Sequence, residues 1–192
     1  DMRVKDEEKI PRIYHAAITV VNRYGLEGCS MSKIADEAGV SAATIYLYFD
    51  NKEDMLTKLF IHTKDRMGHS YFSDNMDMSV SKATFRTIFL NHYQYIINNI
   101  EEYIFLEDFS TSAQISLVKP EFRVDYCPVF ESLFNRSKES GLLQNMHNDI
   151  IYSLLFAPLS FLIKKTLNEK SHSLNTEDLM RIFEASWRAI SK

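Results

Sequence analysis

The sequence predicts an all-α protein of about nine helices, and three observations support that expectation. Apolar residues recur at intervals of three and four over long stretches, which is the spacing of one face of a helix. Only five glycines and four prolines interrupt the 192 residues, and so few breaks favour long helices over a fold with many turns. No convincing stretch alternates apolar and polar residues as a half-buried strand does.

The first helix should begin near residues 9–11, because proline is tolerated in a first helical turn. Its apolar positions recur at helical spacing from Ile13 to Tyr24. Gly25 should end the helix, since glycine is common just after a helix and rare inside one.

Two short helices should come next. Ser30 or Ser32 can cap the first of them, because a serine hydroxyl accepts a hydrogen bond from a free backbone N–H of the first turn. Gly39 should end that helix. Ser41 can then cap the other, which should run to about Phe49.

Six longer helices should complete the chain. Asp50 with Glu53, or Asn51 with Asp54, gives the first of them the character of a capping box. Pro158 should bend the fifth, because proline removes a backbone donor and clashes with the preceding turn. The expected bounds are about 52–71, 80–99 and 101–115, then a helix bracketed or kinked by Pro120 and Pro128 and ended by Gly141, then 149–167 and 176–190.

Composition limits the classes of function. Forty-five per cent of the residues are hydrophobic, so a sizeable core is expected, and the net charge is −4. Residues 1–56 hold seven basic and ten acidic residues, a net charge of −3. A surface that binds nucleic acid would therefore have to be a small basic patch with the acidic side chains turned away.

The sequence also indicates where the protein is located and whether its cysteines are reduced. No apolar run approaches the roughly 20 residues that span a bilayer. The first residues are charged and lack the apolar region of a signal peptide, so a cytoplasmic protein without membrane contact is expected. Cys29 and Cys127 are few and far apart, which favours two reduced thiols, with a redox switch as the alternative.

Residues 30–49 meet the requirements of a helix-turn-helix, in which two helices cross at a sharp angle over a short turn. The first helix needs a very small residue where the second packs against it, and Ala35 supplies one. The corner needs a residue that tolerates a left-handed backbone, and Gly39 supplies that. The second helix is short and rich in hydrogen-bonding side chains, which favours a DNA-reading role over an ordinary helical hairpin.

These residues carry a family resemblance. The stretch "GLEGCSMSKIADEAGVSAATIYLYFDNKEDML" resembles the DNA-binding segment of the TetR/AcrR family of bacterial transcriptional regulators, including its "IA..AGVS..T.Y.YF..KE.L" pattern. The match covers about the first third of the chain, and the remainder shares the helical layout of the family. The resemblance implies a DNA-binding domain over residues 1–51 and a ligand-binding and dimerisation domain over 52–192.

Carried over by position, the resemblance implies a recognition helix from Ala42 to Tyr48. The chain departs from the family where Ala42 and Ala43 replace longer polar or glycine residues, so this pair can contact thymine methyl groups but cannot hydrogen-bond a guanine. Ile10 also stands where an arginine is frequent. The expected DNA-binding residues are Ser32, Lys33, Ser41, Ala42, Ala43, Thr44, Tyr46, Leu47, Tyr48 and Lys52.

One recognition helix reads too few base pairs for useful specificity, so a homodimer on a palindromic operator is expected. Two apolar stripes near the C-terminus are able to pack as a four-helix bundle across a two-fold axis, although the same stripes could serve the core of a single chain. The residues expected at the dimer interface are Ile151, Leu155, Leu159, Leu162, Ile163, Leu179, Phe183, Trp187 and Ile190.

The larger domain is rich in aromatic residues, which suits a pocket for a hydrophobic or aromatic small molecule. An aromatic stripe is more often plain core, and both interpretations stay open. The residues expected to line a ligand site are Phe89, His92, Tyr93, Phe109, Tyr126, Phe130, Tyr152 and Phe156.

Together these features predict a ligand-responsive transcriptional repressor that leaves its operator DNA when a small molecule binds. The alternative is a helical adaptor that kept the helix-turn-helix fold without specific DNA binding. The net negative charge of residues 1–56 and the pair Ala42–Ala43 favour this alternative. No catalytic signature appears in the sequence, so no enzyme is expected. No cofactor or metal is expected either, because His62 and His69 are too far apart to chelate one ion unaided.

Overall fold

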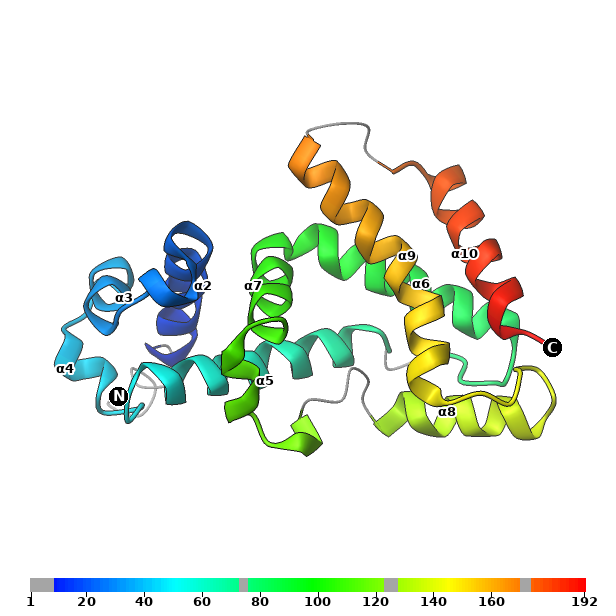
Figure 1. The fold of residues 1–192 in the computed structure, drawn as a ribbon, viewed down its shortest axis with the longest axis horizontal. Helices are drawn as coiled ribbons and strands as arrows, with labels where there is room; N and C mark the ends of the chain where they lie inside the picture. The colour runs from blue at the N-terminus through cyan, green and yellow to red at the C-terminus, as the bar shows by residue number, and fades with distance from the viewer. Residues whose placement is uncertain (1–8, 73–75, 123–127, 170–173) are drawn as a thin grey trace. The chain divides into compact units, whose positions relative to one another are not determined.

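The computed structural model describes residues 9–72, 76–122, 128–169 and 174–192 (Figure 1). Every regular secondary-structure element among these residues is a helix. An isolated bridge between Leu143 and Ser191 is the one β-type pairing within them. The expected all-α fold is therefore confirmed. No helix in the described ranges combines the length and the apolar character needed to cross a membrane.

The chain forms two compact units. One comprises Asp1–Arg66 with Asn98–Arg123, and the other comprises Met67–Ile97 with Val124–Lys192. Helix α5 (Lys52–Ser70) contributes residues to both units. The boundary expected between residues 51 and 52 does not coincide with a boundary of these packing units, and as a boundary between two functions it stays a prediction.

The first unit begins with helix α2 (Lys9–Gly28), which is broken at Gly25. Gly25 has φ 73° and ψ 167°, far from helical values, so the expected stop is confirmed and a further short turn follows it. The buried face of α2 holds Ile13, Ala17 and Val20. Tyr24 was expected on the same stripe but is 48% exposed, because it lies at the last helical position before the break.

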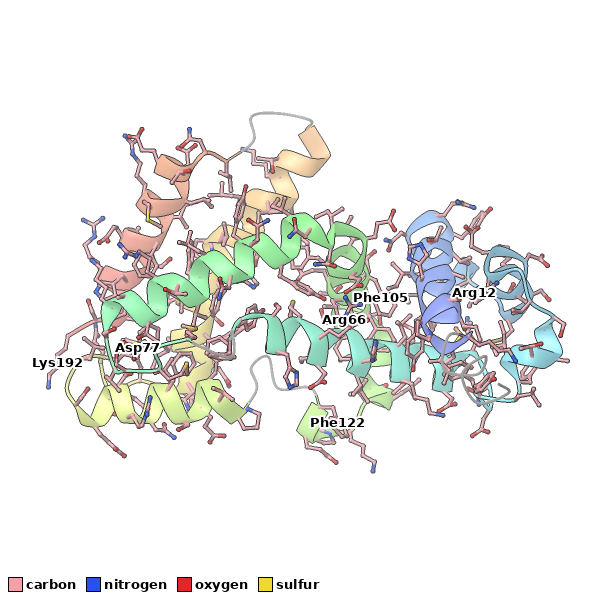
Figure 2. All side chains as sticks on the ribbon, turned by 180° about the vertical axis from the view of Figure 1, so that it is seen from behind. Arg12, Arg66, Asp77, Phe105, Phe122 and Lys192 are labelled. Carbon is pink, nitrogen blue, oxygen red and sulfur yellow. The ribbon has the colours of Figure 1, made fainter. Side chains whose placement is uncertain are left out.

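Helix α7 (Ile100–Ser110) packs within this unit against α2 and α5. The rings of Phe60 on α5 and Phe109 on α7 stack with their centroids 4.7 Å apart. Arg66 of α5, labelled in Figure 2, donates to the carboxylate of Glu102 of α7 over 2.7 Å. These contacts make α7 part of the unit that carries the helix-turn-helix.

The helix expected over residues 101–115 is shorter than predicted, since α7 ends at Ser110. The next residue, Thr111, turns its hydroxyl back onto the carbonyl oxygen of Glu107 over 2.9 Å. Hydroxyl groups that bond nearby carbonyls compete with helical hydrogen bonding, and serine and threonine crowd this stretch. Two short 3-10 helices follow, η1 (Ala113–Leu117) and η2 (Pro120–Phe122).

The second unit contains most of α6 (Lys82–Asn98) and all of α8 (Pro128–Glu139), α9 (Asn148–Glu169) and α10 (Thr176–Ile190). Helices α9 and α10 lie side by side (Figure 1). Phe85 of α6 stacks on Phe134 of α8 and touches Trp187 of α10, so three helices share one aromatic core. Proline begins α8, and Gly141, with φ 76°, follows its end as the sequence predicted.

Candidate nucleic-acid interface

The turn between α3 (Met31–Ala38) and α4 (Ala42–Ile45) has the geometry that the sequence predicted. Gly39 adopts a left-handed backbone with φ 64° and ψ 38°, and its N–H donates to carbonyls of the last turn of α3. Arg12 of α2, labelled in Figure 2, donates from Nη2 to the carbonyl oxygen of Ala38 over 2.6 Å. A cation at the negative end of α3 stabilises the corner, and sequence reasoning did not find it because the two residues lie 26 positions apart.

Helix α4 is capped by Ser41, whose hydroxyl accepts from the N–H of Thr44 over 3.2 Å. The hydroxyl oxygens of these two residues also lie 2.9 Å apart, so Thr44 is fixed in orientation. The regular helix ends at Ile45, whereas the sequence predicted a rod to Tyr48. Residues 46–48 continue as hydrogen-bonded turns, because Ile45 and Phe49 are both buried and bend the chain back onto the unit.

The residues expected to meet DNA differ in exposure. Tyr46 is 55% exposed and Leu47 78% exposed, so the turn after α4 presents an aromatic and an apolar side chain to solvent. Two further positions, Ser32 and Lys33, project from the first turn of α3. Ser41 and Ala43 are also exposed, whereas Ala42, Thr44, Tyr48 and Lys52 are half-buried.

Two lysines lie close to the break in α2. Lys33 donates from Nζ to the carbonyl oxygen of Gly28 over 2.7 Å, and its ammonium lies 4.3 Å from the centroid of the Tyr24 ring. Lys52, at the start of α5, donates to the carbonyl oxygen of Leu26 over 3.4 Å. Because an ammonium group has three N–H donors, both lysines retain donors for an anion. The sequence did not reveal that Tyr24 would hold Lys33.

Cys29 lies between these lysines and is buried with a free thiol. Burial raises the pKa of the Cys29 thiol, and the charges of Lys52 and Lys33 oppose that shift without cancelling it. A raised pKa disfavours the reactive thiolate, which favours the reduced, structural thiol for Cys29 over the redox switch. Cys127 lies outside the described residues.

In the second unit, His92 of α6 lies in an aromatic cluster. Its Nδ1 is 2.8 Å from the hydroxyl of Tyr71, and its Nε2 is 3.4 Å from the hydroxyl of Ser160. The rings of Phe156 and Tyr71 pack on the imidazole, with centroids 4.7 Å and 5.3 Å away. Complete burial lowers the pKa of His92 to about 3, so the ring is neutral near pH 7 and hydrogen-bonded on both sides.

The residues expected to line a ligand site are not all brought together. Phe130, Tyr152 and Phe156 join the cluster around His92, and Tyr152 is half-buried. Elsewhere in the same unit, Phe89 packs on Phe183, and the half-buried Tyr93 donates its hydroxyl to Leu174. Phe109 belongs to the first unit, where it stacks on Phe60, and Tyr126 lies outside the described residues.

Most of the side chains expected at the dimer interface are buried within a single chain, which favours the alternative that these stripes serve its own core. Eight of the nine are already buried inside the second unit of a single chain, and Leu162 is half-buried. They pack against one another and against α6, as the contact between Phe183 and Phe89 shows. On α9, Ile150 and Phe161 are 50% and 66% exposed, and the residues of the dimer interface stay a prediction. The eight are Ile151, Leu155, Leu159, Ile163, Leu179, Phe183, Trp187 and Ile190.

Two family descriptions match the chain. Residues 13–59 match "Bacterial regulatory proteins, tetR family". Residues 81–191, more than half of the chain, match "Tetracyclin repressor-like, C-terminal domain". The first match spans most of α2, all of α3 and α4 and the start of α5, and the second spans the helices from α6 to α10.

Known proteins are similar along the whole chain. An uncharacterized HTH-type transcriptional regulator of Haemophilus influenzae is 27% identical over 205 residues, and the alignment covers all of both proteins. The crystal structure of a TetR family transcription regulator from Marinobacter aquaeolei has a TM-score of 0.85 at 24% identity and covers 99% of each chain. The structure of FadR from Bacillus subtilis in complex with stearoyl-CoA has a TM-score of 0.69 at 20% identity, covering 92% of this chain and 95% of that one.

Proposed function

Because the chain belongs to the TetR family of bacterial regulatory proteins, we propose that it represses transcription as a homodimer and leaves its operator when a small molecule binds. Its family is one of DNA-binding transcriptional regulators rather than enzymes. The observation that carries the proposal is the turn after α4, which holds Tyr46 and Leu47 in solvent while Ile45 and Phe49 anchor it from below. An exposed aromatic and an exposed apolar side chain on the turn after a helix-turn-helix suit contacts with the sugars, phosphates and thymine methyl groups of DNA.

On DNA, α4 and its following turn enter the major groove. Ala43 and Leu47 contact thymine methyl groups and sugar edges, because apolar side chains match those surfaces. Tyr46 donates its hydroxyl to a phosphate oxygen. Lys33 and Lys52 bind backbone phosphates, each at the first turn of a helix whose free N–H groups favour an anion. The two lysine side chains give the DNA-facing surface a local positive charge, although the unit as a whole is not basic.

A homodimer doubles the contact area and explains a palindromic operator, since two copies place two reading turns at half-sites about one helical turn of DNA apart or slightly more. The interface uses the exposed sides of α9 and α10 and excludes the buried stripes. On α9, Ile150 and Phe161 stand apart by three helical turns on the solvent side, and Phe161 is the larger anchor.

The effector is a hydrophobic small molecule that binds in the second unit. The cluster of Phe130, Tyr152 and Phe156 supplies an apolar wall, and the half-buried Tyr152 and Ser160 mark the side from which a ligand reaches it. The similar FadR structure is described as a complex with stearoyl-CoA, whose long alkyl chain fits the same class. Such a ligand releases DNA if it prefers the DNA-incompetent form by a few kcal/mol.

The test is an electrophoretic mobility-shift titration with the DNA upstream of the gene itself, run at low and moderate salt. Tyr46→Phe removes only a hydroxyl, and Leu47→Ala removes only apolar contacts; each should weaken operator binding by about five- to tenfold. The matched control is Leu117→Ala, because Leu117 is also exposed in the first unit, at 53%, but lies on η1. This control should bind as the wild type does.

A wild-type protein that ignores all such DNA at low salt would end the proposal and favour the adaptor. Equal binding by the Tyr46 and Leu47 variants and the control would show that the turn after α4 does not read the operator. Release is tested by adding long-chain acyl-CoA or free fatty acid of the same chain length to the preformed complex. Loss of the shifted band at micromolar ligand is the expected result.

A further inference from the structure

The solvent-facing side of α10 carries a stripe of four charged residues. They stand at helical positions i, i+4, i+7 and i+11, which places them within an arc of about 60° on one face. The opposite face holds Leu179, Phe183 and Trp187, all buried in the core of the unit. The stripe, named here the α10 charge ladder, consists of Glu177, Arg181, Glu184 and Arg188, and all four are exposed.

The α10 charge ladder is complementary to its own reverse. Its midpoint falls between Ile182 and Phe183. Glu177 and Arg188 lie equally far from that midpoint on opposite sides, and so do Arg181 and Glu184. Every acid is thus mirrored by a base. When two copies of the helix pack antiparallel with a two-fold axis through this midpoint, each residue faces the residue that mirrors it. Such a pair of helices would form four pairs of opposite charges.

Contacts within the chain leave this arrangement available. Glu177 pairs with Arg181 of the next turn, and both side chains stay more than 70% exposed. Glu184 accepts from Lys82 of α6 over 2.7 Å and keeps half of its surface in solvent. Among the described residues no carboxylate lies within ion-pair distance of Arg188, which lies in the last turn of α10. A carboxylate accepts several hydrogen bonds, so these pairs do not block further partners.

The surface around the ladder is shaped for another helix. A shallow groove runs along the same side of α10, lined by the four ladder residues together with Met180. Ala185 and Ala189 flank the ladder, are exposed, and have side chains short enough for a second helix to come close. The exposed residues of this face are the four charged residues and two alanines, with no large apolar side chain among them, so the charges select a partner more than they supply affinity.

We propose that the α10 charge ladder sets the register in which two copies of this chain pair, and that it selects a second copy over other helical proteins. The inference rests on the homodimer of the proposed function and goes beyond it, because it names the residues that decide which chain is accepted. Glu177 meets Arg188 of the partner subunit, and Arg181 meets Glu184 of the partner subunit. A related regulator without the mirrored charges would bring like charges together and be rejected.

Charge reversal in the full-length chain tests the ladder. Arg181→Glu alone, or Glu184→Arg alone, places like charges opposite each other twice per dimer and should weaken self-association about 10- to 100-fold. The double variant restores opposite charges and should associate within about threefold of the wild type. Self-association is measured by analytical ultracentrifugation over a concentration series. Arg86→Glu is the matched control, since Arg86 is an exposed arginine of α6 outside the ladder.

The decisive measurement mixes the two single variants. One chain then carries only acids at positions 181 and 184 and the other carries only bases, so a mixed dimer should form at least about tenfold more tightly than either variant with itself. Differently tagged chains report it by co-purification after mixing. Misfolding cannot produce this rescue, and far-ultraviolet circular dichroism confirms helix content in each variant.

Single variants that associate as the wild type does, or a mixture no tighter than its components, would overturn the proposed register. The wild type separates this inference from the proposed function. A wild-type chain that stays monomeric at all concentrations overturns the homodimer and the register together. A wild-type dimer that ignores the charge reversals and still binds operator DNA overturns the register alone.

Discussion

Acidification should destabilise the protein through His92. The ring is fully buried and neutral in the folded chain, with a pKa of about 3 against 6.5 for an unperturbed histidine. Between those two values the unfolded chain binds a proton at this position and the folded chain does not. Stability contributed by His92 is therefore fully present above pH 6.5 and falls as the pH drops through this window.

The magnitude follows from the two pKa values. Between pH 7.5 and 5.0 the unfolded chain gains nearly one proton at His92 and the folded chain gains almost none. This difference lowers the free energy of unfolding by about 2 kcal/mol. This loss is a large share of the free energy of unfolding of a typical protein, which is about 5–15 kcal/mol.

The assay is urea unfolding followed by far-ultraviolet circular dichroism at pH 7.5 and 5.0, with protein concentration held constant. The variant His92→Gln keeps hydrogen-bonding groups toward Tyr71 and Ser160 but does not titrate. It should lose about 2 kcal/mol less than the wild type over the same interval. Tyr71→Phe is the control, because it removes one hydrogen bond and leaves the histidine, so the full pH effect should remain. Equal losses in wild type and His92→Gln would refute the reasoning.

Three further substitutions probe local structure. Gly39→Ala should lower the free energy of unfolding by about 1–2 kcal/mol, because a residue with a side chain is strained at φ 64°. Space is not the cause, since the nearest atom to the added Cβ, Arg12 Nη2, is 3.5 Å away. Thermal melts measure the effect, and an unchanged melting temperature would contradict it. Arg12→Met removes the donor to the carbonyl oxygen of Ala38 and should lower the free energy of unfolding by about 1–2 kcal/mol. Operator affinity should fall as well, because the corner between α3 and α4 loosens. Arg12→Lys keeps a cationic donor and should restore part of the stability and part of the affinity. Asn175 accepts from the N–H of Asp178 in a capping box on α10, so Asn175→Ala should cost about 1 kcal/mol and Asn175→Asp very little; similar losses in the two would exclude a capping role.

Much of the local structure was predictable because its causes lie within a few residues. Serine hydroxyls at 30 and 41 accept from the backbone three residues later, and glycines at 25, 39 and 141 take the positive φ that other residues avoid. These interactions depend on short sequence separation and little else. The helix-turn-helix was found in the same way, since its corner and its small crossing residue lie close together in the chain.

Two helices ended earlier than the sequence predicted, one for a local reason and one for a tertiary reason. The helix after residue 100 ended early because Thr111 and Ser112 compete for backbone carbonyls, a tendency that apolar periodicity does not reveal. The recognition helix shortened to four residues because Ile45 and Phe49 must both be buried in a small unit. In both places a tertiary or side-chain demand outweighed the regular helix that the spacing indicated.

By itself, the sequence determined the order of the helices, most of their caps and corners, and that a helix-turn-helix precedes a large helical region. Only the tertiary structure decided which partner covers each apolar stripe. Periodicity shows that a face such as Leu179–Ile190 avoids water, but water is excluded equally well by the chain's own core and by a second copy. The folded chain buries that face internally, and so leaves the opposite, charged face of α10 to meet whatever comes from outside.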